Sequence, residues 1–176
     1  MSVATPRRIQ VRGSSGSGKT TLATELARRL GAPHVELDAL VHGAGWTQAT
    51  DEELRARLDP LLEEPAWVVD GNYTSKLGTF VSDRAELVVW LDLPLRVSLY
   101  RALRRSVARI RDGTELWNGN RQTWRGAFWG RDSLLVYSLR NHRRVSDLIP
   151  ATVPAEKLVR LRSSREARAW LDRLAV

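Results

Sequence analysis

GSSGSGKT, residues 13–20, is the stretch that decides the fold, because it matches the phosphate-binding pattern G-x-x-x-x-G-K-[ST] at every fixed position. A polyphosphate needs several backbone N–H donors that converge on its oxygens, and glycines let the chain wrap it closely. A β-compatible run at 8–11 precedes the motif, and Leu22, Leu26 and Leu30 follow it at helical spacing before Gly31. This strand–loop–helix context predicts a nucleotide-phosphate site at a helix N-terminus.

The residue types in this motif predict contacts with ATP and Mg²⁺. Lys19 is expected to reach the β- and γ-phosphates, and the Thr20 hydroxyl is expected to ligate Mg²⁺. The residues expected to surround the phosphates are Gly13, Ser14, Ser15, Gly16, Ser17, Gly18, Lys19 and Thr20.

Short apolar segments alternate with helical patterns along the rest of the chain. We expect further strands at 33–37, 67–69, 87–91 and 157–161, and helices at about 18–30, 50–64, 75–82, 94–110, 123–142 and 163–174. Capping-box pairs, Thr50 with Glu53 and Ser163 with Glu166, mark two helix starts. The order predicts one domain over residues 1–176, a three-layer α/β/α P-loop NTPase fold with a five-stranded parallel sheet and a helical lid at about 101–144.

An aspartate follows three of the expected strands: Asp38, Asp70 and Asp92. Ligands of parallel α/β sheets bind beyond the carboxyl ends of the strands, so all three should lie near the phosphate loop. Asp70 ends a Walker-B-like apolar run and is expected to hold Mg²⁺, directly or through water. Asp38 is expected to hydrogen-bond an acceptor hydroxyl or to act as its base. Asp92 precedes a proline and a helix, so we expect it to cap that helix.

The positive charge of the chain is concentrated in one segment. The net charge is +8, and residues 96–144 hold 12 arginines against 3 acids. Arg101, Arg105 and Arg109 recur every four residues on one helix face. Such a segment attracts nucleotide phosphates or a nucleic-acid backbone. The chain has no cysteine and no apolar run long enough to span a bilayer, and we expect a cytoplasmic protein without a membrane partner.

Together these motifs resemble the adenylate-kinase-like P-loop kinases, and most closely the small bacterial group known as topology modulation proteins. The resemblance covers about Arg8 to Arg144 and extends the expected nucleotide site to Thr21. It rests on residues 13–21, LDAL at 37–40, GW at 45–46, WVVDGNY at 67–73 and LDLP at 91–94. It implies an Mg²⁺- and ATP-dependent phosphotransferase with a mobile lid.

The resemblance also implies roles for lid arginines. In adenylate kinases the helix after the fourth strand supplies one arginine that stacks on the ATP base and another that meets phosphates, and the matching positions are Arg101 and Arg105. A lid arginine followed by aspartate also contacts phosphates there, and Arg131 before Asp132 is the candidate. A solvated helix face is the alternative for these arginines. The expected catalytic set is Lys19, Asp38, Asp70, Arg105 and Arg131.

The segment after the third strand departs from the adenylate kinases, which carry a Pro-Arg pair whose arginine binds the acceptor phosphate. Tyr73 and Thr74 stand at those positions, and Lys76 is the nearest cation. Asp38 is more similar to the acid that handles the acceptor hydroxyl in shikimate and gluconate kinases. The resemblance therefore implies ATP as donor and leaves the acceptor open, either a small molecule or a nucleotide.

Aromatic residues in the lid keep other functions open. Trp117, Trp124, Phe128 and Trp129 lie among the arginines and could stack on bases, although the spacing of Trp124 and Phe128 is also typical of a packed helix face. Trp46 is expected to wall the acceptor pocket, and the three histidines receive no role. The alternatives to a kinase of small molecules are a nucleic-acid-binding NTPase, a polynucleotide kinase or a nucleotide-dependent regulatory protein.

Overall fold

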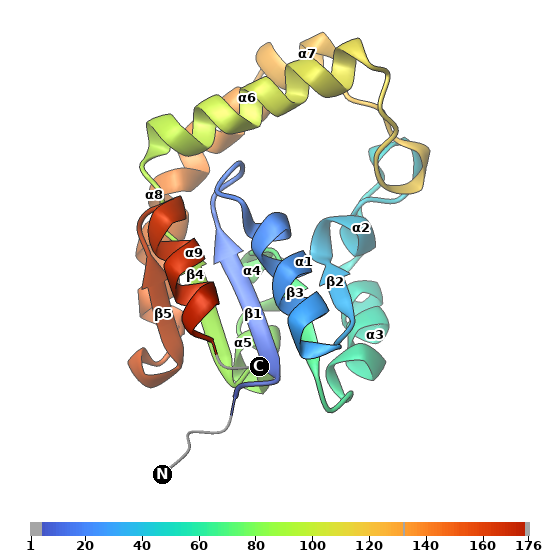
Figure 1. Cartoon of the computed structure of the whole chain (residues 1–176). Helices are drawn as coiled ribbons and strands as arrows, with labels where there is room; N and C mark the ends of the chain where they lie inside the picture. Colours follow the sequence, from blue (N-terminus) through green and yellow to red (C-terminus); the bar gives the residue numbers. More distant parts are fainter. Residues whose placement is uncertain (1–4, 132, 175–176) are drawn as a thin grey trace.

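Five parallel strands form one sheet in a computed structural model that describes residues 5–131 and 133–174. Their order across the sheet is β2-β3-β1-β4-β5, with β1 paired to both β3 and β4. The strands are β1 (Arg8–Gly13), β2 (His34–Glu36), β3 (Trp67–Asp70), β4 (Leu87–Leu91) and β5 (Leu158–Leu161). All carboxyl ends meet at one edge, and the chain leaves the central strand there into the glycine-rich loop (Figure 1).

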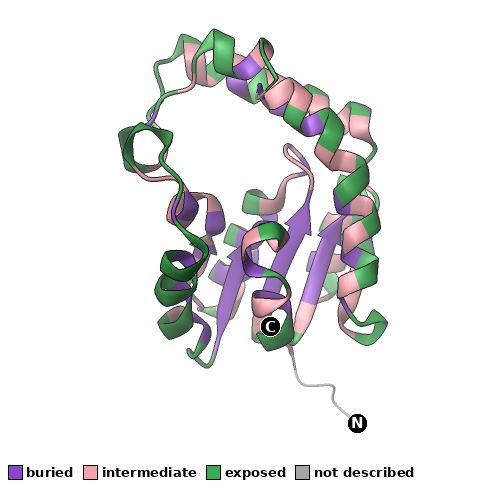
Figure 2. Cartoon of the chain, turned by 180° about the vertical axis from the view of Figure 1, so that it is seen from behind, coloured by how far each residue is buried: buried purple, intermediate pink, exposed green. Residues whose placement is uncertain are grey.

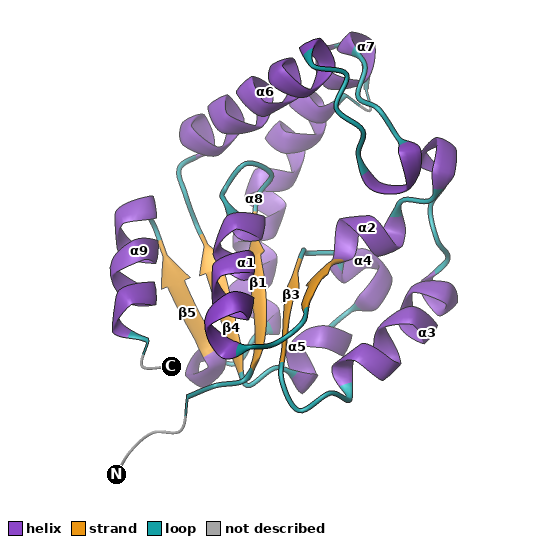
Figure 3. Ribbon diagram, turned by 45° about the vertical axis from the view of Figure 1, so that its right-hand side comes forward, coloured by secondary structure: helices purple, strands orange, loops and turns teal. Residues whose placement is uncertain are grey.

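Helices cover both faces of the sheet, so the predicted α/β/α fold is confirmed. One face carries α1 (Lys19–Leu30) and α9 (Ser164–Arg173). The other carries α2 (Leu37–Val41), α3 (Asp51–Leu62), α4 (Thr74–Leu77), α5 (Phe80–Arg84) and α8 (Leu134–Thr152). Helix α6 (Leu95–Arg111) and helix α7 (Trp124–Phe128) arch over the carboxyl edge, and a long loop descends from them toward α2 (Figure 3).

Burial is concentrated on the two faces of the sheet and not in the arch (Figure 2). Ile9, Val11 and Leu26 belong to the apolar cluster under α1 and α9. Trp67, Trp90 and helix α8 belong to the cluster on the opposite face. The core therefore fixes the strand ends, while the elements above them are held by more local contacts.

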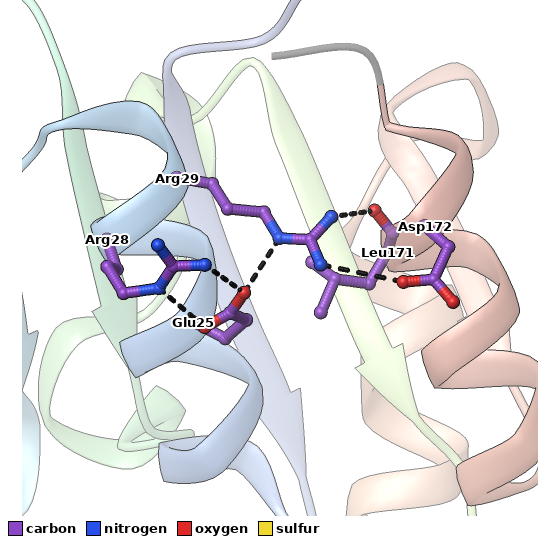
Figure 4. A network of polar contacts seen from close by, with 5 residues as sticks. All are labelled: Glu25, Arg28, Arg29, Leu171 and Asp172. Atoms are coloured by element: carbon purple, nitrogen blue, oxygen red, sulfur yellow. Dashed lines mark hydrogen bonds and ion pairs between the residues drawn. The ribbon is translucent and has the colours of Figure 1, made fainter.

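Helices α1 and α9 are also joined by a polar network near the sheet end that lies opposite the glycine-rich loop (Figure 4). Glu25 accepts hydrogen bonds from Arg28 and Arg29 of its own helix. Arg29 also donates to the Leu171 carbonyl at 2.7 Å and lies 3.5 Å from Asp172. This network holds the last helix against the helix that begins at the phosphate loop.

Three expected elements differ from the structure. The helix expected at 123–142 is broken into α7 and α8, because Gly130 takes a φ of 100° between them. The helix expected near 75–82 is two short helices, α4 and α5, separated at Gly78 with a φ of 59°. The second strand ends at Glu36, and Asp38 lies in the first turn of α2, because Leu37 turns inward and packs on Gly71.

Candidate active site

The glycine-rich loop wraps as the motif requires, and none of its three glycines can be replaced without strain. Gly18 is the N-cap of α1 with a φ of 97°, and Gly16 has a φ of 79°. A Cβ at Gly16 would collide with the Ser98 carbonyl oxygen and the Ala102 nitrogen. The apex of the loop is therefore in direct contact with α6, which roofs the phosphate site.

The segment after β3 fastens the base of this loop, a role that the sequence pattern did not reveal. Asn72 Oδ1 accepts from Gly13 N at 3.1 Å, and Asn72 Nδ2 donates to Gly13 O at 2.7 Å. Arg12 donates to Thr74 Oγ1 at 2.6 Å, and that hydroxyl donates to Asn72 O at 3.1 Å. Arg12 is only 2% exposed, and burial lowers the pKa of its guanidinium to about 10. A closed network thus couples the phosphate loop to residues 72–74.

Lys19 lies among the groups that the sequence predicted around the phosphates. Its Nζ donates to Ser14 O at 3.2 Å, so the side chain folds across the loop. Burial lowers the pKa of the Lys19 ammonium, the carboxylates of Asp38 and Asp70 oppose that shift, and Arg105 adds to it. Three other residues of the expected catalytic set, Asp38, Asp70 and Arg105, thus contribute to the electrostatic environment of Lys19.

The loop has buried polar atoms that form no hydrogen bond with the described residues. The hydroxyls of Ser14 and Ser17 are buried and have no hydrogen-bond partner among the residues described. Such groups are costly to bury unless a ligand satisfies them. Phosphate oxygens supply the missing acceptors, so the loop fits the polyphosphate of ATP.

Asp70 and Thr20 are the residues expected at Mg²⁺. Asp70 is 3% exposed, and its Oδ2 has no hydrogen-bond partner among the described residues, although His34 Nε2 lies 3.5 Å away. Thr20 lies exposed in the first turn of α1. No group of three or more metal-binding side chains occurs in residues 5–131 and 133–174. One buried carboxylate, one hydroxyl and phosphate oxygens suit Mg²⁺, which keeps several waters.

Asp38 is held by a tyrosine from the segment that follows β3. Tyr73 donates its hydroxyl to Asp38 Oδ1 at 2.5 Å, and His42 Nε2 lies 3.2 Å from the same hydroxyl. Because the tyrosine proton goes to Asp38, His42 donates to the tyrosine oxygen through Nε2. Burial, then the charge of Asp38, raise the pKa of Tyr73, so its hydroxyl stays protonated and keeps donating. Tyr73 takes a positive φ of 24°, a strained backbone for a bulky residue.

The loop that descends from the arch closes on the segment around His42. We call residues 115–121 the lid loop and residues 42–48 the acceptor loop, and each is bridged at its ends. Asn118 Nδ2 donates to His42 O at 2.5 Å, and Asn120 Nδ2 donates to Gly43 O at 2.9 Å. Asn120 Oδ1 accepts from Trp46 N at 2.9 Å. These contacts latch the arch onto the side of the sheet where Asp38 lies.

Aromatic rings fill the join between the two loops. His42 stacks on Trp117 with ring centroids 6.0 Å apart and meets the edge of Trp46 at 5.5 Å. Trp117 Nε1 donates to Glu36 Oε2 at 3.0 Å. The role of Trp46 at an acceptor pocket stays a prediction. The stacking of His42 on Trp117 was not predicted, because it joins segments far apart in sequence.

Helix α6 crosses above the site and carries arginines spaced by four residues along one face. Arg101 donates to Ser164 Oγ at 3.0 Å, next to the start of α9. Arg105 contributes to the lowered pKa of Lys19, and the charges of Glu36 and Asp38 partly oppose the lowering of the pKa of Arg109. A groove of about 680 Å³ runs along α6 and is lined by Arg96, Val97, Tyr100, Arg101, Arg104, Arg105 and Ala108. Arg101 and Arg105 line this groove, and their contacts with ATP stay a prediction.

Three other expected residues lie away from this cluster. Arg131 is exposed between α7 and α8, so its phosphate role stays a prediction, and the Asp132 next to it is outside the described residues. Asp92 does not cap α6, whose N-cap is Pro94; it accepts from Arg160 Nε at 2.9 Å instead, because β5 lies alongside. Lys76 is engaged by the Ala49 carbonyl at 2.9 Å and by Asp51 at 3.4 Å.

The remaining aromatic side chains of the lid pack against one another, as expected for a packed helix face rather than for a platform that stacks on bases. Trp124 and Phe128 stack with ring centroids 5.8 Å apart, and Phe128 meets Trp129 at 6.0 Å. Trp124 and Trp129 are still 48% and 67% exposed.

No helix within the described ranges is long and apolar enough to cross a bilayer.

Solved structures share this architecture over nearly the whole chain. A shikimate kinase from Bacteroides thetaiotaomicron superposes with a TM-score of 0.59 at 17% identity, covering 96% of both chains. A gluconokinase from Sinorhizobium meliloti 1021 gives 0.52 at 22% identity, covering 97% of this chain and 94% of its own. The fold is that of a P-loop kinase.

A third P-loop kinase structure, the shikimate kinase from Acinetobacter baumannii in complex with shikimate, gives a TM-score of 0.56 at 18% identity, covering 94% of this chain and 89% of its own. No family model and no curated protein matches the sequence. The likeness to P-loop kinases is therefore one of fold, and membership of the topology modulation group stays a prediction.

Proposed function

We propose that this protein is a kinase that transfers the γ-phosphoryl group of Mg·ATP to a hydroxyl of a small molecule. The observation that carries the proposal is the convergence of Lys19 with Asp38, whose carboxylate is held by Tyr73. A donor-phosphate group and an acceptor-side base thus share one site under the roof of α6. The kinases with the same fold support this assignment.

The residues divide the reaction between them. The loop amides and Lys19 bind the β- and γ-phosphates, and Arg105 neutralises charge that spreads over the transferring group. Thr20 and Asp70 would hold Mg²⁺, which would supply further charge neutralisation at the phosphates. In this proposal Arg101, which lies beside Ser164, contacts the base of ATP.

On the acceptor side, Asp38 accepts the hydroxyl proton as the acceptor oxygen bonds to the γ-phosphorus. The bond from that phosphorus to the β,γ-bridging oxygen breaks, and ADP carries away the electron pair. Tyr73 and His42 keep Asp38 in one orientation during this step. The roof of α6 and the latched lid loop exclude water that would otherwise take the phosphoryl group.

The hydrogen bonds between the lid loop and the acceptor loop favour a small acceptor over a polynucleotide. The lid loop is fastened to the acceptor loop beside Asp38, which leaves little freedom for a long chain to pass. The exposed arginines of the arch keep nucleic acid as the second candidate. We place the kinase in the cytoplasm, in the group of topology modulation proteins, on its sequence motifs alone.

The test is a screen of hydroxylated metabolites, sugars and nucleotides for ADP release, with phosphorus NMR of each hit. We expect Mg·ATP to bind by calorimetry and at least one acceptor to yield a phosphate ester. Tight ATP binding without transfer to any acceptor would indicate a regulatory protein instead. ADP release that rises only with oligonucleotides, and whose stimulation falls steeply with salt, would favour the second candidate.

A further inference from the structure

His34, the first residue of β2, has no role in the reaction described above, yet its ring lies next to a residue of the candidate active site. Strands β2 and β3 pair so that His34 stands opposite Val68. Because side chains alternate along a strand, Val68 and Asp70 share one face of β3, and Val68 belongs to the apolar cluster under α1 and α9. The His34 ring contacts Thr24 of α1 and Asp70 on that face. His34 therefore joins the end of β3 to α1.

Asp70 is a buried carboxylate that needs a hydrogen-bond donor. It is only 3% exposed, and a buried charge costs free energy unless a cation or hydrogen bonds compensate it. Within residues 5–131 and 133–174, the one basic side chain that comes within 4.0 Å of Asp70 is His34, whose Nε2 lies 3.5 Å from Oδ2. Both of these atoms are buried, and neither has a hydrogen-bond partner among the described residues. Each is thus the nearest available partner of the other.

The other donors around Asp70 are already engaged. Lys19, which interacts electrostatically with Asp70, donates to Ser14 O at 3.2 Å. Asn72, two residues after Asp70, uses its amide nitrogen to donate to Gly13 O at 2.7 Å. Among the described residues, the imidazole on β2 is therefore the donor that is left for the carboxylate.

Thr24 contacts the other nitrogen of the His34 ring. Its Oγ1 lies 3.4 Å from Nδ1 and donates to Thr20 O at 2.8 Å. Because an ionised carboxylate only accepts hydrogen bonds, Nε2 carries the ring proton when it faces Asp70, and Nδ1 is then the acceptor that faces the Thr24 hydroxyl. Thr20 and Asp70 are the two residues expected at Mg²⁺, so one histidine connects the elements that carry them.

We propose that His34 is a positioning residue for the metal: its Nε2–H donates to Asp70 Oδ2 and orients the carboxylate, so that Oδ1 is the oxygen presented to Mg²⁺. Hydrogen bonds from neighbouring groups orient metal-binding carboxylates and tune their affinity for the ion. The inference rests on the assignment of Asp70 to Mg²⁺ in the proposed function. Because His34 acts through Asp70, its loss should weaken Mg²⁺-dependent nucleotide binding and leave the binding of metal-free nucleotide unchanged.

The first test measures the binding of a non-hydrolysable ATP analogue to the full chain by calorimetry, once with Mg²⁺ and once with EDTA. The ratio of the two Kd values is the gain in affinity that Mg²⁺ supplies. His34→Gln keeps an N–H donor near the place of Nε2, whereas His34→Asn keeps one only near the place of Nδ1. We expect His34→Asn to lower the gain about 10-fold or more and His34→Gln to keep most of it. The Kd in EDTA should stay within about twofold in both variants.

The second test asks whether His34 acts through Asp70. In Asp70→Asn the gain from Mg²⁺ should already be small, and adding His34→Asn should change it by no more than about twofold. Thr24→Val removes the hydroxyl beside Nδ1 at an exposed position, and it should lower the gain a few-fold. Should His34→Asn fail to fold, an unchanged gain in Thr24→Val overturns the inference.

The outcomes separate this inference from the kinase function. An equal gain in the wild type and in His34→Asn overturns the inference, even if Tm falls, because His34 would then only support the fold; transfer to an acceptor leaves the kinase standing. Additive losses in the double variant also overturn it. A gain that depends on His34, without transfer to any acceptor, supports the inference and overturns the kinase. No gain in the wild type overturns the inference together with the assignment of Asp70 to Mg²⁺.

Discussion

The donor half and the acceptor half of the site are built in different ways. The donor half is one contiguous stretch, residues 13–20, whose backbone geometry is set by its own glycines. The acceptor half joins Asp38, Tyr73, Arg109 and the lid loop, which come from four separate segments. If the proposed function is correct, local chemistry specifies how the donor is held, while tertiary contacts specify what receives the phosphoryl group. Substitutions in the first half should abolish activity, and those in the second half should lower it by smaller amounts that differ between residues.

Lys19→Ala should have the largest effect, because it removes the ammonium that, in the proposed reaction, binds the transferring phosphate. We expect kcat/KM to fall about 10³-fold, as for loss of a preorganised charge in other active sites. The folded protein should keep or gain stability, since a partly desolvated charge is removed. Transfer assays and thermal unfolding check the two parts. Near-normal turnover in a folded Lys19→Ala protein would remove the basis of the kinase assignment.

Asp38→Asn should follow, with kcat lower by about 10²-fold and the Kd of Mg·ATP unchanged. The amide keeps the size of the side chain and cannot take the acceptor proton. Calorimetry and steady-state kinetics separate the two effects. A variant that loses ATP binding as well would show that Asp38 belongs to the donor half.

Tyr73→Phe should be milder than Asp38→Asn, because it keeps the proposed base and removes only the hydroxyl that hydrogen-bonds to it. A hydrogen bond to a charged group contributes about 1.5–3 kcal/mol, so kcat should fall about 10- to 100-fold. The KM of ATP should stay constant, which a general loss of structure would not produce. Thr74→Ser, at the adjacent position, retains the hydroxyl that bonds Arg12 and serves as the control.

Asn120→Ala should unlatch the lid loop without touching the reacting groups. Asn120 is 4% exposed and joins Gly43, Trp46 and Trp117 through its side chain. We expect faster hydrogen exchange in residues 115–121 and a KM for the acceptor that rises a few-fold, since buried amide partners cost about 1–3 kcal/mol to lose. Asn118→Gly keeps the left-handed backbone at φ 56° and should act in the same direction, more weakly. An unchanged hydrogen-exchange rate in Asn120→Ala would show that the two loops are held together by the packing of the His42 and Trp117 rings instead.

The same division decides what could be predicted from sequence. The five strands, the phosphate loop and the placement of Asp70 follow from short-range patterns, and the fold was predicted correctly on them. Tyr73 was noted only as a departure, and its bond to Asp38 depends on a strained turn that no periodicity encodes. His42 and Asn120 gave no signal, because their partners lie far away in sequence. Arg109 did stand in a visible row with Arg101 and Arg105, but the spacing does not show that Arg109 is the partly buried one of the three.

The smallest effect should come from Glu25, which is far from both halves in the network that joins α1 to α9 (Figure 4). Hydrogen bonds from Arg28 and Arg29 lower the pKa of Glu25 to about 2 from an ordinary value of 4.5. A lowered acid pKa means that the stabilisation is fully present above the ordinary value and is lost as the pH falls toward about 2.

Glu25→Gln should therefore lower Tm slightly at pH 7, and the difference from the wild type should shrink as acid is added. Because the network is largely exposed, about 1 M salt should also remove it. Neither the Kd of ATP nor the KM of the acceptor should change, since the network touches neither half of the site. A Tm difference that survives high salt would mean that Arg29 acts mainly through its bond to the Leu171 carbonyl and the packing of α9, with the charge of Glu25 incidental.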